Sequence, residues 1–219
     1  MVDKRCATVA EALAGIGDGA TIAVGGFGSS GSPEALLAEL LARNVGELTI
    51  VSNNAGNRDD GLARLFAAGR IRKIICSYPR STEELAFDAA YARGGVELEL
   101  VPQGTLSERL RSGGAGIAAF YTPTGAGTEL AAGKETRAFG DRPHVLETAL
   151  VPDFALIRAD RADRWGNLVY HSAARNFGPV MAMAAGATIA EVRSIVELGA
   201  IDPEHVVTPG IFVARVVAV

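Results

Sequence analysis

The stretch Asp18-Gly-Ala-Thr-Ile-Ala-Val-Gly-Gly-Phe-Gly-Ser-Ser-Gly-Ser-Pro-Glu34 decides the fold. Residues 20–25 form an apolar run with β-branched side chains, which is typical of a buried strand. Glycines at positions 25, 26, 28 and 31 follow, and glycine lets a backbone turn tightly or approach a ligand closely. A helix is expected over residues 33–43, with Ser32 as its N-cap and Pro33 at its first position. The stretch therefore predicts a strand, a glycine loop and a helix in direct succession.

The loop between this strand and helix has the features of an anion site. The first N–H groups of a helix lack partners within the helix and lie at the positive end of its dipole, which favours phosphate. The loop is not a Walker A motif, because no Lys-Ser/Thr pair follows, and its spacing does not fit a GxGxxG dinucleotide loop. From the residues alone, a plain glycine-rich turn is an equally good interpretation.

The first half of the chain alternates between apolar β-branched runs and amphipathic runs rich in Ala and Leu. This alternation predicts an α/β fold, with a mainly parallel sheet sandwiched by helices on both faces. The expected strands are 20–25, 48–52, 71–76 and 96–101, and strict alternation marks the last as a half-exposed or edge strand. The expected helices are 8–16, 33–43, 61–68 and 82–91.

The second half has a different pattern. Residues 113–140 are rich in Gly, Thr and Pro. Additional short strands are expected at 145–147, 154–158, 167–170, 188–192 and 211–217, with one helix near 179–185. Trp165 is expected in the core. Because no linker and no internal repeat interrupts the chain, we expect a single domain over residues 1–219.

Composition excludes several classes of function. Of the 219 residues, 26 are glycine, about 12% against an average near 7%. The 21 basic and 25 acidic residues give a net charge of −4, so there is no basic excess for nucleic acid. Cys6 and Cys76 are isolated and are expected to be reduced thiols. No spacing indicates a metal site, and no signal core or membrane span is visible, so a cytoplasmic protein is expected.

Several motifs together resemble a known family. The loop Gly25-Gly-Phe-Gly-Ser-Ser-Gly-Ser-Pro33 resembles the first signature of the family I coenzyme A transferases, which is GGF-x-x-x-G-x-P after an apolar strand. Other segments similar to the family follow in its order: Ser52-Asn-Asn-Ala-Gly56, Val101-Pro-Gln-Gly-Thr-Leu-Ser-Glu-Arg109, Phe120-Tyr-Thr-Pro-Thr-Gly-Ala-Gly-Thr128, Gly133-Lys-Glu135, Trp165-Gly-Asn167, Ala174-Arg-Asn-Phe177 and Thr208-Pro-Gly-Ile211. The resemblance implies the fold that these enzymes share with sugar-phosphate isomerases.

The resemblance also implies a division of labour between two chains. In the family, a glutamate attacks an acyl-CoA thioester, which is nucleophilic catalysis by a carboxylate. That glutamate lies in an S-E-N-G-like motif of the second half of the enzyme, and this chain contains no such motif. We therefore expect this chain to be the first of two different subunits, with no catalytic nucleophile of its own. The partner subunit is expected to carry the glutamate, in an A2B2 assembly in which this chain is the A component. CoA and acyl-CoA are expected as substrates, with no permanently bound cofactor and no metal.

Candidate site residues follow from the family's motifs for Gln103 and the glycine loop, and from position and side-chain chemistry for the others. Gln103, in the PQGTL motif, is expected to support the reaction with its amide; from the residues alone, a strand-end glutamine that satisfies backbone groups is the preferred alternative. Asn53 and Asn54 are expected near the substrate, or else in an asparagine-rich turn. Arg80 is expected to meet a second substrate carboxylate, or else to lie in solvent or an interface. The residues expected to bind CoA are Val24, Gly25, Gly26, Phe27, Gly28, Ser29 and Ser30.

The acceptor acid is suggested by finer details. Ser52-Asn-Asn-Ala-Gly-Asn57, Cys76-Ser-Tyr-Pro-Arg80, Asp163-Arg-Trp-Gly-Asn-Leu168, Asn176-Phe-Gly-Pro-Val-Met-Ala-Met-Ala-Ala185 and Val216-Val-Ala-Val219 most resemble the family members that move CoA from succinyl-CoA to 3-oxoadipate in aromatic-compound degradation. Enzymes that use acetoacetate, acetate or butyrate are the alternative. A stand-alone CoA-binding or ligand-sensing domain is the alternative from a different class, because fold alone does not fix function. For Arg175 and Asn176, a structural or subunit-contact role is favoured.

Overall fold

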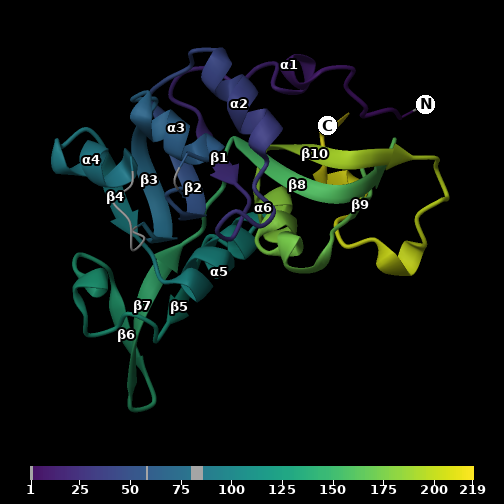
Figure 1. The fold of residues 1–219 in the computed structure, drawn as a ribbon. Coiled ribbons are helices and arrows are strands. Elements are labelled where there is room, and N and C mark those ends of the chain that lie inside the picture. The colour runs from purple at the N-terminus through teal and green to yellow at the C-terminus, as the bar shows by residue number, and fades with distance from the viewer. Residues whose placement is uncertain (1, 58, 80–85) are drawn as a thin grey trace.

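The computed structural model describes residues 2–57, 59–79 and 86–219. Within them, the main sheet has eight strands, in the order β11-β10-β8-β1-β2-β3-β4, with β9 beside β8 (Figure 1). The strands are β1 (Thr21–Val24), β2 (Leu48–Asn54), β3 (Ile71–Tyr78), β4 (Glu97–Leu100), β8 (Phe154–Asp163), β9 (Leu168–Val169), β10 (Ala187–Val196) and β11 (Arg215–Ala218).

The pairing confirms the predicted sheet. Every neighbouring pair from β11 to β4 is parallel, and β9 alone in this sheet, over the described ranges, runs antiparallel to its neighbour. Strand β4 lies at the edge, as its alternating sequence predicts. The chain passes from β1 through β2 and β3 to β4, then returns to β8 on the other side of β1. Such reversals of strand order are where open α/β sheets bind ligands.

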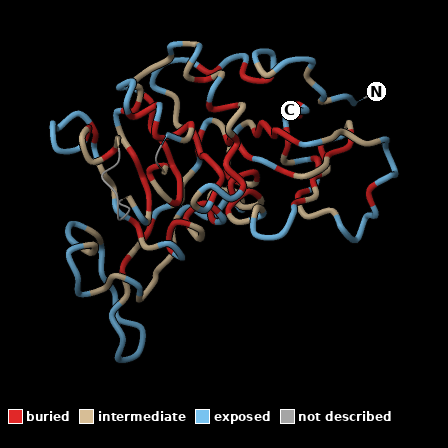
Figure 2. The backbone as a smooth tube through the Cα atoms, viewed as in Figure 1, coloured by how far each residue is buried: buried red, intermediate tan, exposed pale blue. Residues whose placement is uncertain are grey.

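Helices cover both faces of the main sheet, as predicted. Helices α1 (Val9–Ala12), α2 (Glu34–Ala42), α3 (Gly61–Ala67) and α4 (Ala86–Ala92) lie on one face, and α5 (Gln103–Gly114) and α6 (Gly178–Ala184) on the other (Figure 1). Successive side chains of a strand point to opposite faces of the sheet. Ile22 and Val24 therefore join the first core cluster, and Ala23 joins the second. Buried residues accordingly concentrate on the central strands (Figure 2). Each fully buried Leu or Ile stabilises the fold by about 1.5–3 kcal/mol.

A second, antiparallel sheet projects from the edge of the molecule (Figure 1). It consists of β5 (Ala119–Thr122), β6 (Thr136–Phe139) and β7 (Arg142–Thr148), with β7 in the middle. Four short 3-10 helices complete the described elements: η1 (Glu129–Ala131), η2 (Ser172–Arg175), η3 (Pro203–His205) and η4 (Gly210–Phe212).

Arg109 of helix α5 joins the two sheets. Its Nη1 lies 2.7 Å from Glu99 Oε1 on β4, and its Nε donates to the carbonyl of Thr148 on β7 at 2.7 Å. The buried carboxylate of Glu147 lies 3.9 Å from the same Nε. Burial alone would raise the pKa of Glu99, but hydrogen bonds from Arg109 and Lys73 hold that pKa below its ordinary value. Removing one partner from such a buried network costs about 3–5 kcal/mol.

Two glycines allow α5 to pack closely against the rest of the molecule. A Cβ atom at Gly113 would lie 2.1 Å from the carbonyl oxygen of Leu150, and one at Gly114 would lie 2.7 Å from that of Met183. Both distances are far shorter than atomic contact permits. The glycines at the end of α5 are therefore required by the approach of two other backbone segments.

The structure corrects several predicted boundaries. Helix α5 was not predicted, because residues 103–114 include three glycines and no side chain caps their start. The helix predicted over 8–16 is only one turn long, and the strand predicted over 211–217 is divided between η4 and β11. Trp165 was predicted in the core, but 45% of it is exposed. Of the helix predicted over 82–91, residues 82–85 lie outside the described residues.

Candidate functional site

A cleft of about 460 Å³ opens where four neighbouring strands of the main sheet end. The loop after β1, the last residues of β2 and β3, and the first residue of α5, which follows β4, all contribute to its wall. Parallel strands bring their carboxyl ends to one edge, so residues from distant parts of the chain meet there. The lining residues are Phe27, Gly28, Asn53, Asn54, Asn57, Ser77, Tyr78 and Gln103.

Asn53 is the centre of a polar network in this cleft. Its side-chain oxygen accepts hydrogen bonds from Gln103 Nε2 at 2.7 Å and from Ser77 Oγ at 2.8 Å. Asn53 is buried, whereas Gln103 is exposed. The structure therefore brings two predicted site residues, 50 positions apart, into direct contact. The second amide hydrogen of Gln103 has no partner among the described residues and is available to a ligand.

The glycine loop exposes only its tip. Val24 packs in the core, and Gly25 donates its N–H to the carbonyl of Leu156 at 2.9 Å. Phe27 and Ser30 close the tip by exchanging two backbone hydrogen bonds of 3.0 and 3.2 Å. Of the residues predicted to bind CoA, the first three (positions 24–26) are buried, and the tip over residues 27–30 is accessible.

Two backbone N–H groups of the loop tip are free to act as donors. Within the described part of the chain, no hydrogen bond occupies the N–H of Gly28 or of Ser29. Gly28 also lines the cleft. Free backbone N–H groups held in a fixed loop can stabilise an oxyanion that develops during acyl transfer.

Asn176 holds the glycine loop in place from the other half of the chain. Its Oδ1 accepts the N–H of Gly26 at 3.1 Å and that of Phe177 at 2.7 Å. Its Nδ2 donates to the carbonyl of Ser30 at 3.0 Å and also to the carbonyls of residues 173 and 174. One side chain thus binds both ends of the loop tip. This agrees with the structural role that the sequence favoured for Asn176.

The start of helix α2 does not offer a free anion site. The N–H groups of Ala35 and Leu36 donate to one oxygen of Glu191, at 2.9 and 3.1 Å. The predicted cap is also wrong: Pro33 occupies the N-cap position, and the Ser32 hydroxyl donates instead to the carboxylate at position 34. Burial raises the pKa of Glu191, and the backbone hydrogen bonds counteract that shift. The protein's own carboxylate therefore takes the place predicted for a ligand's phosphate.

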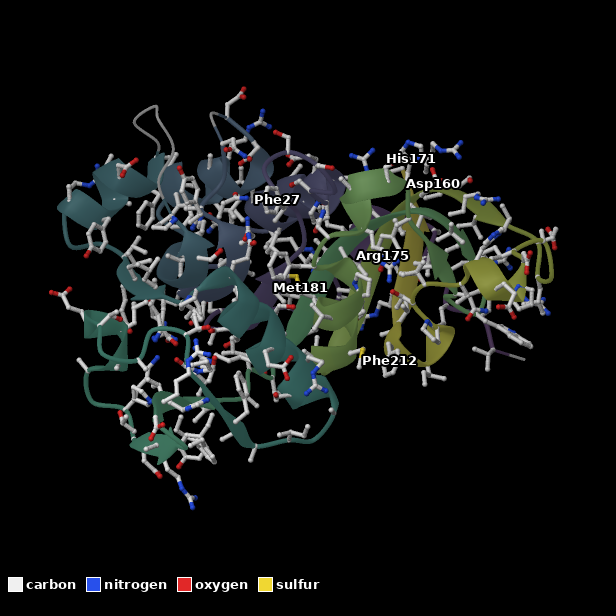
Figure 3. The ribbon with its side chains drawn as sticks, turned by 90° about the horizontal axis from the view of Figure 1, so that it is seen from below. Phe27, Asp160, His171, Arg175, Met181 and Phe212 are labelled. Atoms are coloured by element: carbon white, nitrogen blue, oxygen red, sulfur yellow. The ribbon has the colours of Figure 1, made fainter. Side chains whose placement is uncertain are left out.

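Two exposed aromatic side chains flank the cleft. Phe27, on the loop tip, is 55% exposed, and Tyr78, at the end of β3, is 64% exposed. Phe27 is among the side chains labelled in Figure 3. Both rings border the same cleft, and apolar groups gathered in this way are typical of a surface that receives a ligand or partner.

Two predicted site residues remain, Asn54 and Arg80. Asn54 lines the cleft, and its Oδ1 accepts the N–H of Gly56 at 2.9 Å, so part of its amide is already used by the turn. Arg80 lies outside the described residues. Asn57, Ser77 and Tyr78 line the cleft but were not predicted individually. For Ser77 and Tyr78, the available signal was their place directly after the run predicted as a strand over 71–76.

Neither a metal centre nor a membrane span is found in the described part of the chain. No group of three or more His, Cys, Asp or Glu residues is arranged there to hold a metal ion. No helix in it has the length and apolar character that crossing a bilayer requires.

Comparison with known proteins agrees with the motifs and the fold. The coenzyme A transferase family model matches residues 6–219. The A chain of the 3-oxoadipate CoA-transferase of Pseudomonas putida is 57% identical over 219 residues, covering 100% of this chain and 95% of that protein. The corresponding chain of the succinyl-CoA:3-ketoacid coenzyme A transferase of Xanthomonas campestris is 57% identical over 215 residues, covering 98% and 88%. Both relatives are named as one subunit of their enzymes.

A solved structure supports the same fold at much lower identity. The acyl-CoA transferase apoenzyme of Escherichia coli O157:H7 superposes with a TM-score of 0.85 at 21% identity. The superposition covers 99% of this chain, which spans about half (47%) of that protein. Taken together, the family match and the close relatives show that this chain belongs to the coenzyme A transferase family of enzymes.

The close packing of the glycine loop can be tested at Gly31, the last glycine of the loop. Gly31 and Gly19 have nearly the same positive φ, 76° and 79°, but only Gly31 is crowded: its Cβ would lie 2.5 Å from the carbonyl oxygen of Ala174. We expect Gly19→Ala to cost about 1 kcal/mol for its conformation alone, and Gly31→Ala about 1–3 kcal/mol more for the collision. Urea unfolding measures both, and equal losses would contradict the packing described here.

Proposed function

We propose that this chain is the A component of a two-subunit CoA transferase that moves CoA from succinyl-CoA to a 3-oxoacid, with 3-oxoadipate as the acceptor. The observation that carries the proposal is the cleft, in which Gln103, Asn53 and the glycine-loop tip meet at the carboxyl ends of the strands. The relatives named as single subunits support a different partner subunit, and the proposed assembly is A2B2. The proposed location is the cytoplasm, and the 219 residues are proposed to form one domain.

The reaction is divided between the two chains. A glutamate of the partner subunit attacks the thioester carbonyl, the CoA thiolate leaves, and an acyl-glutamyl anhydride forms. The thiolate then attacks the glutamyl carbonyl, which releases succinate and leaves CoA on the glutamate as a thioester. The same two steps, run in reverse with the acceptor acid, deliver CoA to the acceptor. In this proposal, CoA is a substrate, and the reaction uses no permanently bound cofactor.

To those steps, this chain contributes hydrogen-bond donors and the walls of the cleft. The free N–H groups of Gly28 and Ser29 can stabilise the negative charge that develops on the carbonyl oxygen. Gln103, held by Asn53, can present its remaining amide hydrogen to the incoming carboxylate. The exposed Phe27 supplies an apolar surface for the pantetheine arm. In this proposal, CoA contacts the accessible loop tip, and the buried residues at positions 24–26 shape the loop beneath it.

The identity of the acceptor acid is the most specific part of the proposal. Relatives named for 3-oxoadipate and for 3-ketoacids are equally identical to this chain, at 57%, so identity does not choose between them. The family-like segments from the asparagine-rich turn to the C-terminal strand favour 3-oxoadipate. That acid differs from acetoacetate by a distal carboxylate. Arg80 is proposed to bind the distal carboxylate, since guanidinium groups bind carboxylates bidentately.

Acceptor preference tests the proposed function. The purified complex with the partner subunit, supplied with succinyl-CoA, should use 3-oxoadipate with a kcat/KM at least about tenfold above that for acetoacetate, because one charged hydrogen bond contributes about 1.5–3 kcal/mol. The readout is acyl-CoA formation by chromatography. A preference for acetoacetate would establish the short-chain alternative. CoA binding by this chain, together with no transfer to these acids, to acetate or to butyrate, would establish a binding or sensing domain.

Gln103→Ala tests the contribution of this chain to the chemistry. We expect kcat to fall about 10²-fold, because a preorganised donor to developing charge is lost. Assembly with the partner subunit should not change, as measured by size-exclusion chromatography with light scattering. Ser107→Ala, one turn further along α5, is the control and should keep full activity. Unchanged turnover in Gln103→Ala would remove Gln103 from the reaction.

A further inference from the structure

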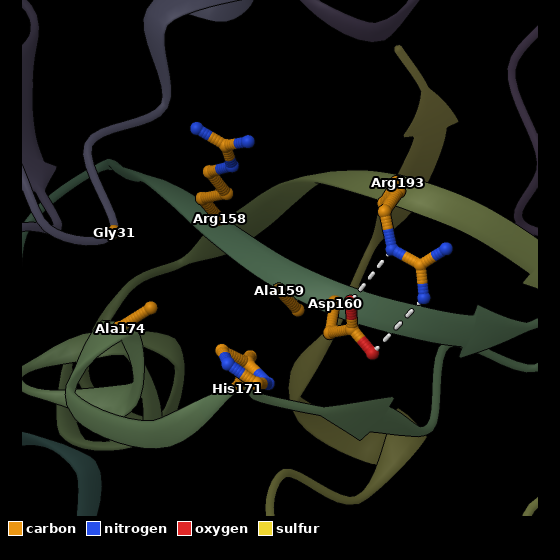
Figure 4. A pocket seen from close by; sticks show the side chains of 7 residues that line it. All are labelled: Gly31, Arg158, Ala159, Asp160, His171, Ala174 and Arg193. Carbon is orange, nitrogen blue, oxygen red and sulfur yellow. Dashed lines mark hydrogen bonds and ion pairs between the residues drawn. The ribbon is translucent and has the colours of Figure 1, made fainter.

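A second hollow lies beside the cleft and is not used by the proposed reaction. It has a volume of about 520 Å³, and its wall includes Gly31, Arg158, Asp160, His171 and Arg193 (Figure 4). The glycine loop contributes Gly28 to the cleft and Gly31 to this recess, so the two hollows are neighbours. In Figure 4, Arg158, His171 and Arg193 lie on three different sides of the recess.

The recess carries an excess of positive charge. Arg193 Nε donates to Asp160 Oδ1 at 2.9 Å, and Arg161 Nε lies 3.5 Å from the other oxygen of Asp160. The hydrogen bond from Arg193 holds the pKa of Asp160 below its ordinary value, so this carboxylate stays charged at neutral pH. Among the described residues, the one carboxylate within ion-pair distance of Arg158 is Glu191, 3.8 Å away. The described wall thus holds two arginines against one aspartate, in a chain whose net charge is −4.

Of the two arginines in the wall of the recess, Arg158 has more unused hydrogen-bond donors. Glu191 Oε1 lies 3.8 Å from Arg158 Nε, which is too far for a hydrogen bond. The other oxygen of Glu191 accepts the N–H groups at the start of α2. Arg158 makes no hydrogen bond to the described residues, and 49% of its side chain is exposed. A guanidinium group has five N–H donors in a planar fork that matches a carboxylate. The recess therefore offers a carboxylate-binding group whose donors are not committed within the chain.

The character of the recess favours a protein side chain over a free phosphate. Its charges are mixed, and the side chains of Arg158 and Arg193 are 49% and 66% exposed. Arginine and aromatic residues together are typical of protein interfaces, and the exposed Phe27 stands on the loop that separates the recess from the cleft. A partner chain whose glutamate reaches the cleft lies against the glycine loop, which borders the cleft at Gly28 and the recess at Gly31. That chain would then cover the recess as well.

We propose that the recess is a contact site for the partner subunit, in which an acidic side chain of that subunit pairs with Arg158 while Arg193 and Asp160 form the rim. The inference rests on the proposed function, which supplies the partner. It adds the place where the two subunits engage beside the reacting groups. Charged groups at the rim of an interface set the association rate and its salt dependence.

The test measures assembly separately from activity. Purified Arg158→Ala and Arg158→Ala/Arg193→Ala chains are titrated with the partner subunit by isothermal calorimetry at low and high NaCl. The control is Arg93→Ala, since Arg93 is exposed and lies before the start of β4, whereas the cleft lies at the carboxyl ends of the strands. We expect the double variant to raise the Kd about tenfold or more at low salt, to reduce its salt dependence, and to melt like the wild type; Arg93→Ala should bind as the wild type does.

The other outcomes overturn the inference in distinguishable ways. If both variants keep the wild-type Kd, the recess does not contact the partner subunit. If the Kd is unchanged but the KM for succinyl-CoA rises and adenosine 3′,5′-bisphosphate no longer protects the complex against heat, the recess binds the phosphates of CoA instead. If the wild-type chain itself does not bind the partner subunit, the proposed function fails before the recess is tested.

Discussion

The amide side chain of Asn176 is the interaction on which the site depends. It binds the backbone at both ends of the glycine-loop tip, at Gly26 and at Ser30, from a position 146 or more residues away. Gly31 must be glycine because the backbone beside Asn176 approaches it closely. With its ends fixed, the loop can present the N–H groups of its tip in one geometry, which is the condition for useful transition-state stabilisation. The C-terminal half of the chain thus shapes a site whose exposed surface comes mainly from the first half.

A carboxylate of the chain itself occupies the start of α2, and the described lining of the cleft carries neutral donors. Glu191 binds the start of α2 beneath the glycine loop. The described lining of the cleft presents amides, a hydroxyl and aromatic rings. Such a lining suits a reaction in which an ionised carboxylate must stay nucleophilic, because a direct cation partner would stabilise its ground state. In the proposed enzyme, Arg158 and Arg193 lie in the neighbouring recess, where they contact the partner subunit.

The fold and much of the site follow from local patterns, whereas contacts between distant segments do not. The apolar run before the glycines and the alternation near residue 97 predict the parallel sheet and its edge strand. The motif containing Gln103 locates one wall of the cleft. The cap of α2 could not be predicted, because its partner Glu191 lies on another strand, and propensity does not show such tertiary contacts. Helix α5 was missed because two of its glycines, which lower helix propensity, are required by close packing against residues 150 and 183.

The central claim is that this chain supplies the donors and a separate subunit supplies the nucleophile. The complex of both subunits is incubated with succinyl-CoA, the thioester is reduced with sodium borohydride, and both chains are digested and analysed by mass spectrometry. The account predicts one reduced glutamyl residue, confined to the partner subunit, with every glutamate of this chain unmodified. A reduced glutamyl residue in this chain would contradict the account.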